Sequence, residues 1–172
     1  MAQVLAFKRL FQRTAVCSIR HLSSSQAADP QKPHYDVIIA GGGLVGVSLA
    51  VSLAKHDTLA DKKVLVLEGA PKFKEFSKDK YSNRVTAINK QSVGLLKKLD
   101  AWSHIESVRC KPILQMQVWD AISGEKINFN FPNFSDQVAT IVENDLILES
   151  LYKQLEPLLN VQVKNESPAT CW

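Results

Sequence analysis

The sequence predicts an α/β fold, in which a Rossmann-like βαβ unit is followed by an antiparallel β-hairpin. Three observations indicate the βαβ unit. An apolar run at 35–40 breaks into the glycines of 41–46, small residues then recur at every fourth position, and a second apolar run follows at 63–67. This order favours a strand, a tight turn, a helix and a second, parallel strand.

The glycines Gly41, Gly43 and Gly46 form the G-x-G-x-x-G fingerprint of dinucleotide-binding turns. Gly41 is expected to turn the chain, Gly43 to let a diphosphate approach the backbone, and Gly46 to let the helix pack closely on the strand. The diphosphate would lie at the helix N-terminus, where unpaired N–H groups and the helix dipole favour negative charge. Because many glycine-rich turns only turn the chain, the neighbouring features are needed to support this interpretation.

Two of these features follow the turn. Gly46, Ala50 and Ala54 share one helix face, which predicts close packing against a sheet. The second apolar run ends at Glu68, near the offset of about 20 residues at which an acidic side chain accepts hydrogen bonds from the ribose of an adenosine. A carboxylate there also repels a 2′-phosphate. The alternative is an ordinary βαβ unit with a solvated glutamate.

The net charge of the chain lies in its first residues. Residues 1–34 carry five basic residues and one acidic residue, which equals the net charge of +4 for all 172 residues. The folded part therefore lacks the excess of positive charge that nucleic-acid binding requires, and we expect no nucleic-acid partner.

Residues 1–25 contain no acidic residue and mix basic, apolar and serine residues, which is typical of a mitochondrial presequence. A basic tail without a targeting role is the alternative. Residues 26–34 are predicted to be a linker and 35–172 the folded part.

The segment after Glu68 is polar and rich in lysine, so 69–80 is predicted to be a loop. A helix is predicted to open at 82–84, to present Ile88, Leu95, Leu96 and Leu99 as its apolar stripe, and to end at 100–102. Arg84 would then lie directly after the loop and close to the bound cofactor, where its guanidinium could reach a phosphate or the edge of a cofactor ring. The alternative is a surface arginine.

The hairpin is predicted within 113–131. Residues 115–120 and 126–131 alternate apolar and polar side chains around a turn, which favours a half-buried antiparallel sheet. Its aromatic residues Trp119, Phe129 and Phe131 are expected to pack in a core. A strand at 138–142, a helix capped within 143–145 and ending near 157, and a strand at 160–164 complete the prediction.

The sequence indicates no catalytic residue and no metal site. The four histidines lie in the leader, the linker and two helix ends, and none is near a nucleophile with an orienting partner. The three cysteines are far apart and odd in number, so neither a zinc site nor a disulfide framework is predicted. If the protein performs chemistry, a bound cofactor must supply it.

Several strings together carry a family resemblance. They are Tyr35–Gly46, Glu68, Tyr81–Ile88, Met116–Asp120 and Ile141–Asp145, of which Ser82-Asn83-Arg84 and Gln117-Val118-Trp119-Asp120 are the most specific. They resemble the mitochondrial flavin-dependent monooxygenases of ubiquinone biosynthesis, within the aromatic-ring hydroxylase family. The resemblance runs from residue 35 to about residue 165 and implies an FAD-binding domain.

The resemblance implies FAD as the cofactor, with Gly41, Gly43 and Gly46 around its diphosphate, Glu68 on its ribose and Arg84 at the flavin side. It also implies hydroxylation of a polyprenylated 4-hydroxybenzoate-type phenol. The implied partners are a ferredoxin system that donates electrons and a ubiquinone-biosynthesis complex, with peripheral attachment to the matrix face of the inner membrane.

Family members are more than twice as long, and their second half closes over the cofactor and builds most of the substrate pocket. The chain is therefore expected to be a partial FAD-binding domain that ends before the second half of the fold. Two alternatives remain open: a truncated, non-catalytic form that keeps only the adenosine half-site, and a nucleotide-binding module of another kind.

Overall fold

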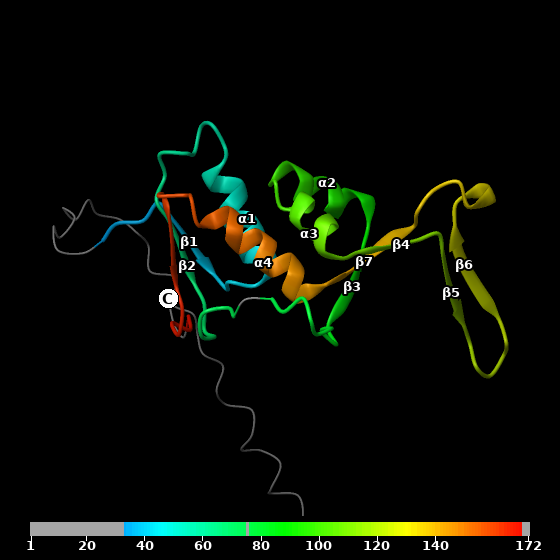
Figure 1. Cartoon of the computed structure of the whole chain (residues 1–172). Coiled ribbons are helices and arrows are strands. Elements are labelled where there is room, and N and C mark those ends of the chain that lie inside the picture. The colour runs from blue at the N-terminus through cyan, green and yellow to red at the C-terminus, as the bar shows by residue number, and fades with distance from the viewer. Residues whose placement is uncertain (1–32, 75, 170–172) are drawn as a thin grey trace, which may run out of the picture. The chain divides into compact units, whose positions relative to one another are not determined.

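A computed structural model describes residues 33–74 and 76–169. The chain divides into two units, Met1–Pro33 and His34–Trp172, and the helices and strands labelled in Figure 1 belong to the second. The predicted presequence at 1–25 and nearly all of the predicted linker at 26–34 lie outside the described residues.

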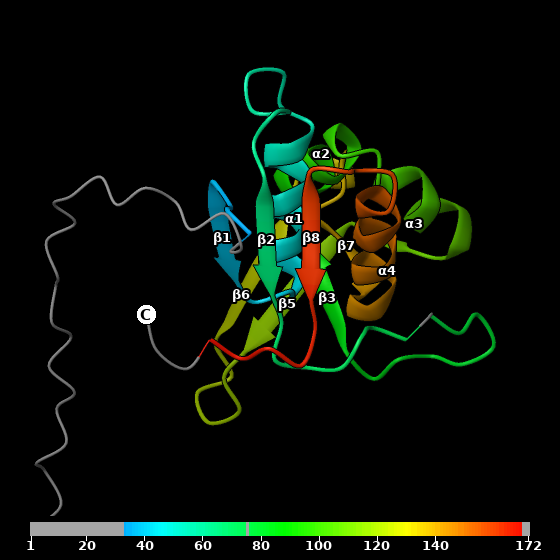
Figure 2. The ribbon, with the colours of Figure 1, turned by 90° about the vertical axis from the view of Figure 1, so that its left-hand side faces the viewer.

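The first sheet contains three parallel strands in the order β1-β2-β8. They are β1 (Val37–Ala40), β2 (Val64–Leu67) and β8 (Val161–Lys164). Helix α1 (Leu44–Ala54) connects β1 to β2, and α4 (Asn144–Leu155) precedes β8. Figure 2 shows both helices behind the same face of this sheet. The βαβ unit predicted from the glycines and the two apolar runs is confirmed.

The core lies between this sheet and the helices. Ala50 and Ala54 of α1 are buried, as expected from the small-residue face of that helix. Removal of such apolar surface from water is the main stabilising contribution to the fold. The largest fully buried apolar side chains are Val47, Val51, Val64, Val66, Ile105, Val142, Leu146 and Leu151.

A second sheet corrects one prediction. It is antiparallel, with the order β3-β7-β4, and contains β3 (Val85–Ile88), β4 (Lys111–Ile113) and β7 (Ala139–Glu143). The helix predicted to open at 82–84 is wrong there, because β3 pairs with β7. The helix α2 (Lys90–Lys98) begins only after Asn89, whose side chain caps it by accepting a hydrogen bond of 2.9 Å from the Ser92 N–H.

The predicted end of the helix at 100–102 is confirmed at Asp100 but is wrong at Trp102. Asp100 has a positive φ of 61°, a left-handed conformation that interrupts the helix. Trp102, predicted to lie at a helix end, instead opens α3 (Trp102–Val108) and is buried.

The hairpin is present within the predicted range. Strands β5 (Gln115–Trp119) and β6 (Lys126–Asn130) are antiparallel and, within residues 33–74 and 76–169, pair only with each other. Their residues are all exposed, so the prediction of a half-buried sheet is wrong for the described part of the chain. The predicted packing residues Trp119, Phe129 and Phe131 are 64%, 48% and 43% exposed. A 3₁₀ turn at Pro132–Phe134 follows the hairpin.

The predicted strands at 138–142 and 160–164 correspond to β7 and β8. The predicted cap of α4 lies at Glu143, but the cap makes no side-chain hydrogen bond to the helix because the Glu143 carboxylate binds Arg109 instead. No helix among the described residues is long and apolar enough to cross a bilayer. Nor do those residues gather three metal-binding side chains.

Candidate nucleotide site

The glycine turn joins the end of β1 to the start of α1. Gly41 has a φ of +111°, which side-chain-bearing residues rarely adopt, and its N–H donates to the Leu67 carbonyl at 2.8 Å. A β-carbon on Gly46 would lie 1.9 Å from the Gly41 carbonyl oxygen and 3.3 Å from Cγ2 of Ile39. Only glycine at position 46 therefore allows the helix to start this close to the strand.

Gly43 lies on the open side of the turn. It is the N-cap of α1, and its carbonyl oxygen accepts the Val47 N–H at 3.0 Å. A β-carbon on Gly43 would meet no atom within 4 Å. Because the first N–H groups of a helix have no partner within the helix, this open side can hold an anion against backbone amides.

Glu68 is held beside the same turn. Its Oε2 accepts the Gly42 N–H at 2.6 Å, and its Oε1 accepts the Ala70 N–H at 2.8 Å. A carboxylate has about four acceptor positions, so two bonds leave capacity for the hydroxyls of a ribose. The structure thus brings Gly41, Gly43, Gly46 and Glu68 together.

Sequence reasoning did not single out Gly42 or Tyr152. The Tyr152 hydroxyl donates to the Gly42 carbonyl oxygen at 3.2 Å, and its ring stacks on Phe73 with centroids 5.9 Å apart. Burial, followed by the charge of Glu68, raises the pKa of Tyr152. The three consecutive glycines at 41–43 could have indicated that Gly42 also has a role in the turn. Tyr152 carries no such signal, because its contact depends on how α4 packs.

Arg84 lies at the other end of α4. Its carbonyl oxygen accepts the Asn144 N–H at 2.9 Å, and its own N–H donates to the Ser82 hydroxyl at 3.2 Å. Eight residues of helix separate Asn144 from Tyr152, a rise of about 12 Å. The structure therefore does not bring Arg84 into the glycine turn, and one ligand would have to extend along α4 to reach both.

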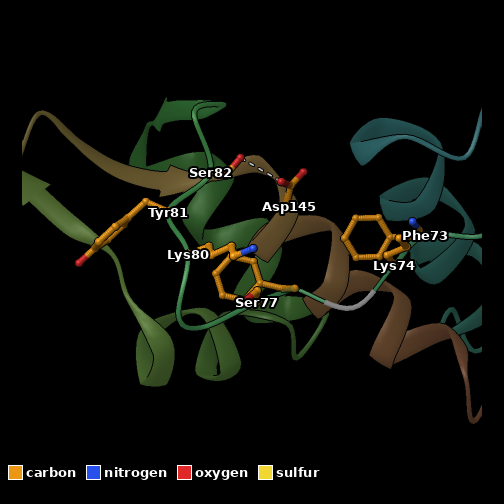
Figure 3. Close-up of a pocket in the computed structure, with 8 residues that line it drawn as sticks. Phe73, Lys74, Ser77, Lys80, Tyr81, Ser82 and Asp145 are labelled. Carbon is orange, nitrogen blue, oxygen red and sulfur yellow. Dashed lines mark hydrogen bonds between the residues drawn. The ribbon is translucent and has the colours of Figure 1, made fainter.

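A cavity of about 320 Å³ lies between the loop that leads to Ser82 and the start of α4. Figure 3 shows that the Ser82 hydroxyl points to Asp145, and the two side chains are hydrogen-bonded at 2.9 Å. The cavity combines aromatic, cationic and hydroxyl side chains. They are Phe73, Lys74, Phe76, Ser77, Lys80, Tyr81, Ser82 and Asp145.

Two acidic side chains hold the loop above this cavity. Glu143 binds Arg109, which in turn donates to the carbonyl oxygens of Lys78 and Lys80 at 2.9 and 2.8 Å. Glu149 accepts the Phe76 N–H at 3.2 Å. The loop that leads to Ser82 and Arg84 is therefore fixed by the packed helices and by β7.

No protein-family model matches the chain. Two curated relatives are similar over most of it, both named ubiquinone biosynthesis monooxygenase COQ6, mitochondrial. The Drosophila melanogaster protein is 52% identical over 139 residues, which are 80% of this chain and 29% of the relative. The Danio rerio protein is 41% identical over 161 residues, which are 89% of this chain and 33% of the relative. The chain thus spans about a third or less of the length of these relatives.

Solved structures share the fold. The crystal structure of PqsL from Pseudomonas aeruginosa, described as a probable FAD-dependent monooxygenase, superimposes with a TM-score of 0.57 at 18% sequence identity. The match covers 78% of this chain and 33% of that one. The likeness shows that this chain shares its fold with part of that protein.

Proposed function

Since the chain belongs to the family of mitochondrial ubiquinone biosynthesis monooxygenases, we propose that the protein acts as an FAD-dependent monooxygenase. Its substrate would be a polyprenylated 4-hydroxybenzoate-type precursor of ubiquinone, hydroxylated on the aromatic ring. The names of the relatives support the pathway, and the phenolic substrate follows from the family resemblance.

The geometry of the glycine turn is the observation that carries the proposal. Gly46 is packed against the Gly41 carbonyl oxygen, whereas Gly43 faces open space at the start of an 11-residue helix. Glu68 is fixed on the neighbouring strand end by two backbone N–H groups. The exposed backbone amides at the start of α1, which packs closely on β1, suit the diphosphate of FAD, and the Glu68 carboxylate suits its ribose.

Each of these residues would have a separate role toward FAD. The amides at Gly43 and in the first turn of α1 would bind the diphosphate, the turn being shaped by Gly41 and Gly46. Glu68 would accept the ribose hydroxyls, and Arg84 would lie at the flavin side, along α4. Bound FAD would supply the oxygen-activating chemistry. The chain spans about a third of its relatives, so the substrate pocket would draw on residues in the remaining length.

The partners and the location follow from the same family. We propose that electrons come from a ferredoxin system and that the protein works in a ubiquinone-biosynthesis complex, attached peripherally to the matrix face of the inner membrane. The mitochondrial names of the relatives and the composition of residues 1–25 support this location. The proposed domain organisation is a presequence at 1–25, a linker at 26–34 and a partial FAD-binding domain at 35–172.

Disruption of the gene tests the function in cells. Mass spectrometry of the lipid extract should then show less ubiquinone and an accumulated prenylated phenol that lacks one ring oxygen. Normal ubiquinone without such a precursor would contradict the proposal. As a control, a hydroxylated precursor analogue supplied to the cells should restore ubiquinone, since it enters the pathway after the missing step.

A further inference from the structure

Tyr152 contacts the glycine turn from a helix that the fingerprint does not include. Its hydroxyl donates to the Gly42 carbonyl oxygen at 3.2 Å, and its ring is stacked on Phe73 with an interplanar angle of 5°. The stacked ring limits the positions that the hydroxyl can take. A tyrosine hydroxyl is protonated near neutral pH, and burial followed by the nearby Glu68 charge raises its pKa further, so it remains a donor.

The contact sets the direction of one peptide group. The Gly42 carbonyl and the Gly43 N–H belong to the same peptide, and in a trans peptide these two groups point in opposite directions. Among the described residues there is no cis peptide bond. Since the Gly42 carbonyl is turned toward Tyr152 on α4, the Gly43 N–H is turned away from α4. That is the N–H of the residue whose β-carbon position is open.

The preceding peptide is held separately. The Gly42 N–H donates to Oε2 of Glu68 at 2.6 Å, so the peptides on both sides of Gly42 have partners. A β-carbon on Gly42 would lie 3.0 Å from this oxygen and 3.1 Å from the Tyr152 hydroxyl, which shows how closely the two side chains enclose the residue. Without these partners, consecutive glycines would sample many backbone conformations.

We propose that Tyr152 is a positioning residue of the nucleotide site: its hydroxyl holds the Gly42–Gly43 peptide so that the Gly43 N–H faces the diphosphate. That the bound group is a diphosphate rests on the proposed function. The orientation of the Gly42–Gly43 peptide is a property of the free protein and is independent of that function. Tyr152 thus acts through the backbone and needs no contact with the nucleotide.

The test uses the full chain, ADP as the probe and the variant Tyr152→Phe, which keeps the stacked ring and removes only the hydroxyl. In the free protein, the ¹H–¹⁵N resonance of Gly43 should shift or broaden in the variant, because the peptide gains freedom. The affinity for ADP should fall about 3- to 10-fold, the effect of one lost hydrogen bond. Adenosine, which lacks the diphosphate, should bind both proteins equally.

Tyr35→Phe is the matched control, because the Tyr35 hydroxyl is hydrogen-bonded to Gln162 on β8, away from the turn. It should change neither the Gly43 resonance nor the ADP affinity. A second variant, Phe73→Leu, keeps the hydroxyl but removes the ring that orients it, and should weaken ADP binding by a smaller factor.

An unchanged Gly43 resonance in Tyr152→Phe would overturn the proposal, as would equal loss of ADP and adenosine binding, which indicates general damage. If the unmodified chain binds no ADP, the proposed nucleotide site fails. The Gly43 resonance in the free proteins still decides the role of Tyr152 in that case.

Discussion

Gly46 and the carbonyl oxygen of Gly41 are so close that a β-carbon on Gly46 would lie 1.9 Å from that oxygen. The oxygen belongs to the backbone of a turn that is itself hydrogen-bonded to β2, so it cannot move aside like a flexible side chain. This contact ties the sequence fingerprint to the packing of α1 on β1.

Gly46→Ala should therefore destabilise the fold, because the added methyl group forces α1 away from β1. We expect a loss of about 1–3 kcal/mol in the free energy of unfolding, measured by urea denaturation. Gly94→Ala is the matched control: Gly94 lies in α2, its β-carbon would meet no atom within 4 Å, and alanine should stabilise that helix by about 0.5–1 kcal/mol. Equal stability of Gly46→Ala and the unmodified chain would show that the turn is not packed as described.

Arg109 and Glu143 form a two-point ion pair, with Nε to Oε1 at 2.9 Å and a terminal nitrogen to Oε2 at 3.2 Å. The guanidinium also lies 4.3 Å from the ring centroid of Tyr81. Because the Glu143 side chain is only 7% exposed, removal of its partner leaves a buried charge. Arg109→Ala should cost about 3 kcal/mol of folding free energy.

Hydrogen exchange should also increase in the loop of the Arg109→Ala variant around Lys78 and Lys80, whose carbonyl oxygens lose their donor. Asp136→Asn is the control, since it removes an exposed ion pair with Lys90 and should change the unfolding midpoint little. A loop that exchanges no faster in Arg109→Ala would show that the ion pair does not hold it.

Glu149 gives the stability a defined pH dependence. Burial raises the pKa of this carboxyl, but hydrogen bonds from His104 and the Phe76 N–H, and the charge of Lys153, outweigh it and bring the pKa below the ordinary value of 4.5. A carboxyl with a lowered pKa stabilises the fold above its ordinary pKa, and this contribution is lost as the pH falls through the folded-state value.

Glu149→Gln should therefore be less stable than the unmodified chain near neutral pH, and the difference should shrink as the pH falls below 4.5. Urea denaturation across this range measures it. A stability difference that stays constant with pH would contradict the account of Glu149.

The chain by itself, expressed without residues 1–25, should keep little or no FAD through purification, although ADP at millimolar concentration should still bind at the glycine turn. It spans about a third of its relatives, so many cofactor contacts and the protein wall that keeps water from the flavin would come from the remaining length. Flavin absorbance of the purified protein measures this. A yellow protein with one FAD per chain would contradict the expectation.

The βαβ unit could be predicted because its signals are local. The glycines, the small residues of α1 and the apolar run of β2 lie within consecutive residues, and each has a backbone or packing consequence of its own. The hairpin was also predictable, because its alternation and its turn are adjacent in the sequence.

The predictions that were wrong concern residues whose partners are far away in the sequence. Residues 85–88 are too few to separate a strand from a helix, and Ile88 fits the spacing of the following helix, so only the pairing with β7 identifies β3. The exposure of the hairpin could not be read from its alternation, which predicts an apolar face but not what covers it. Tyr152 was missed for the same reason, since its partner Gly42 is 110 residues away in the sequence.

Titration of the ¹⁵N-labelled chain with ADP shows where the diphosphate binds, because it reports each backbone amide separately. We predict that the largest shifts fall on the amides of Gly43 and Leu44, at the start of α1, with a smaller effect around Glu68. Shifts confined to another surface, or an absence of binding at millimolar ADP, would contradict the assignment of the glycine turn as the diphosphate site.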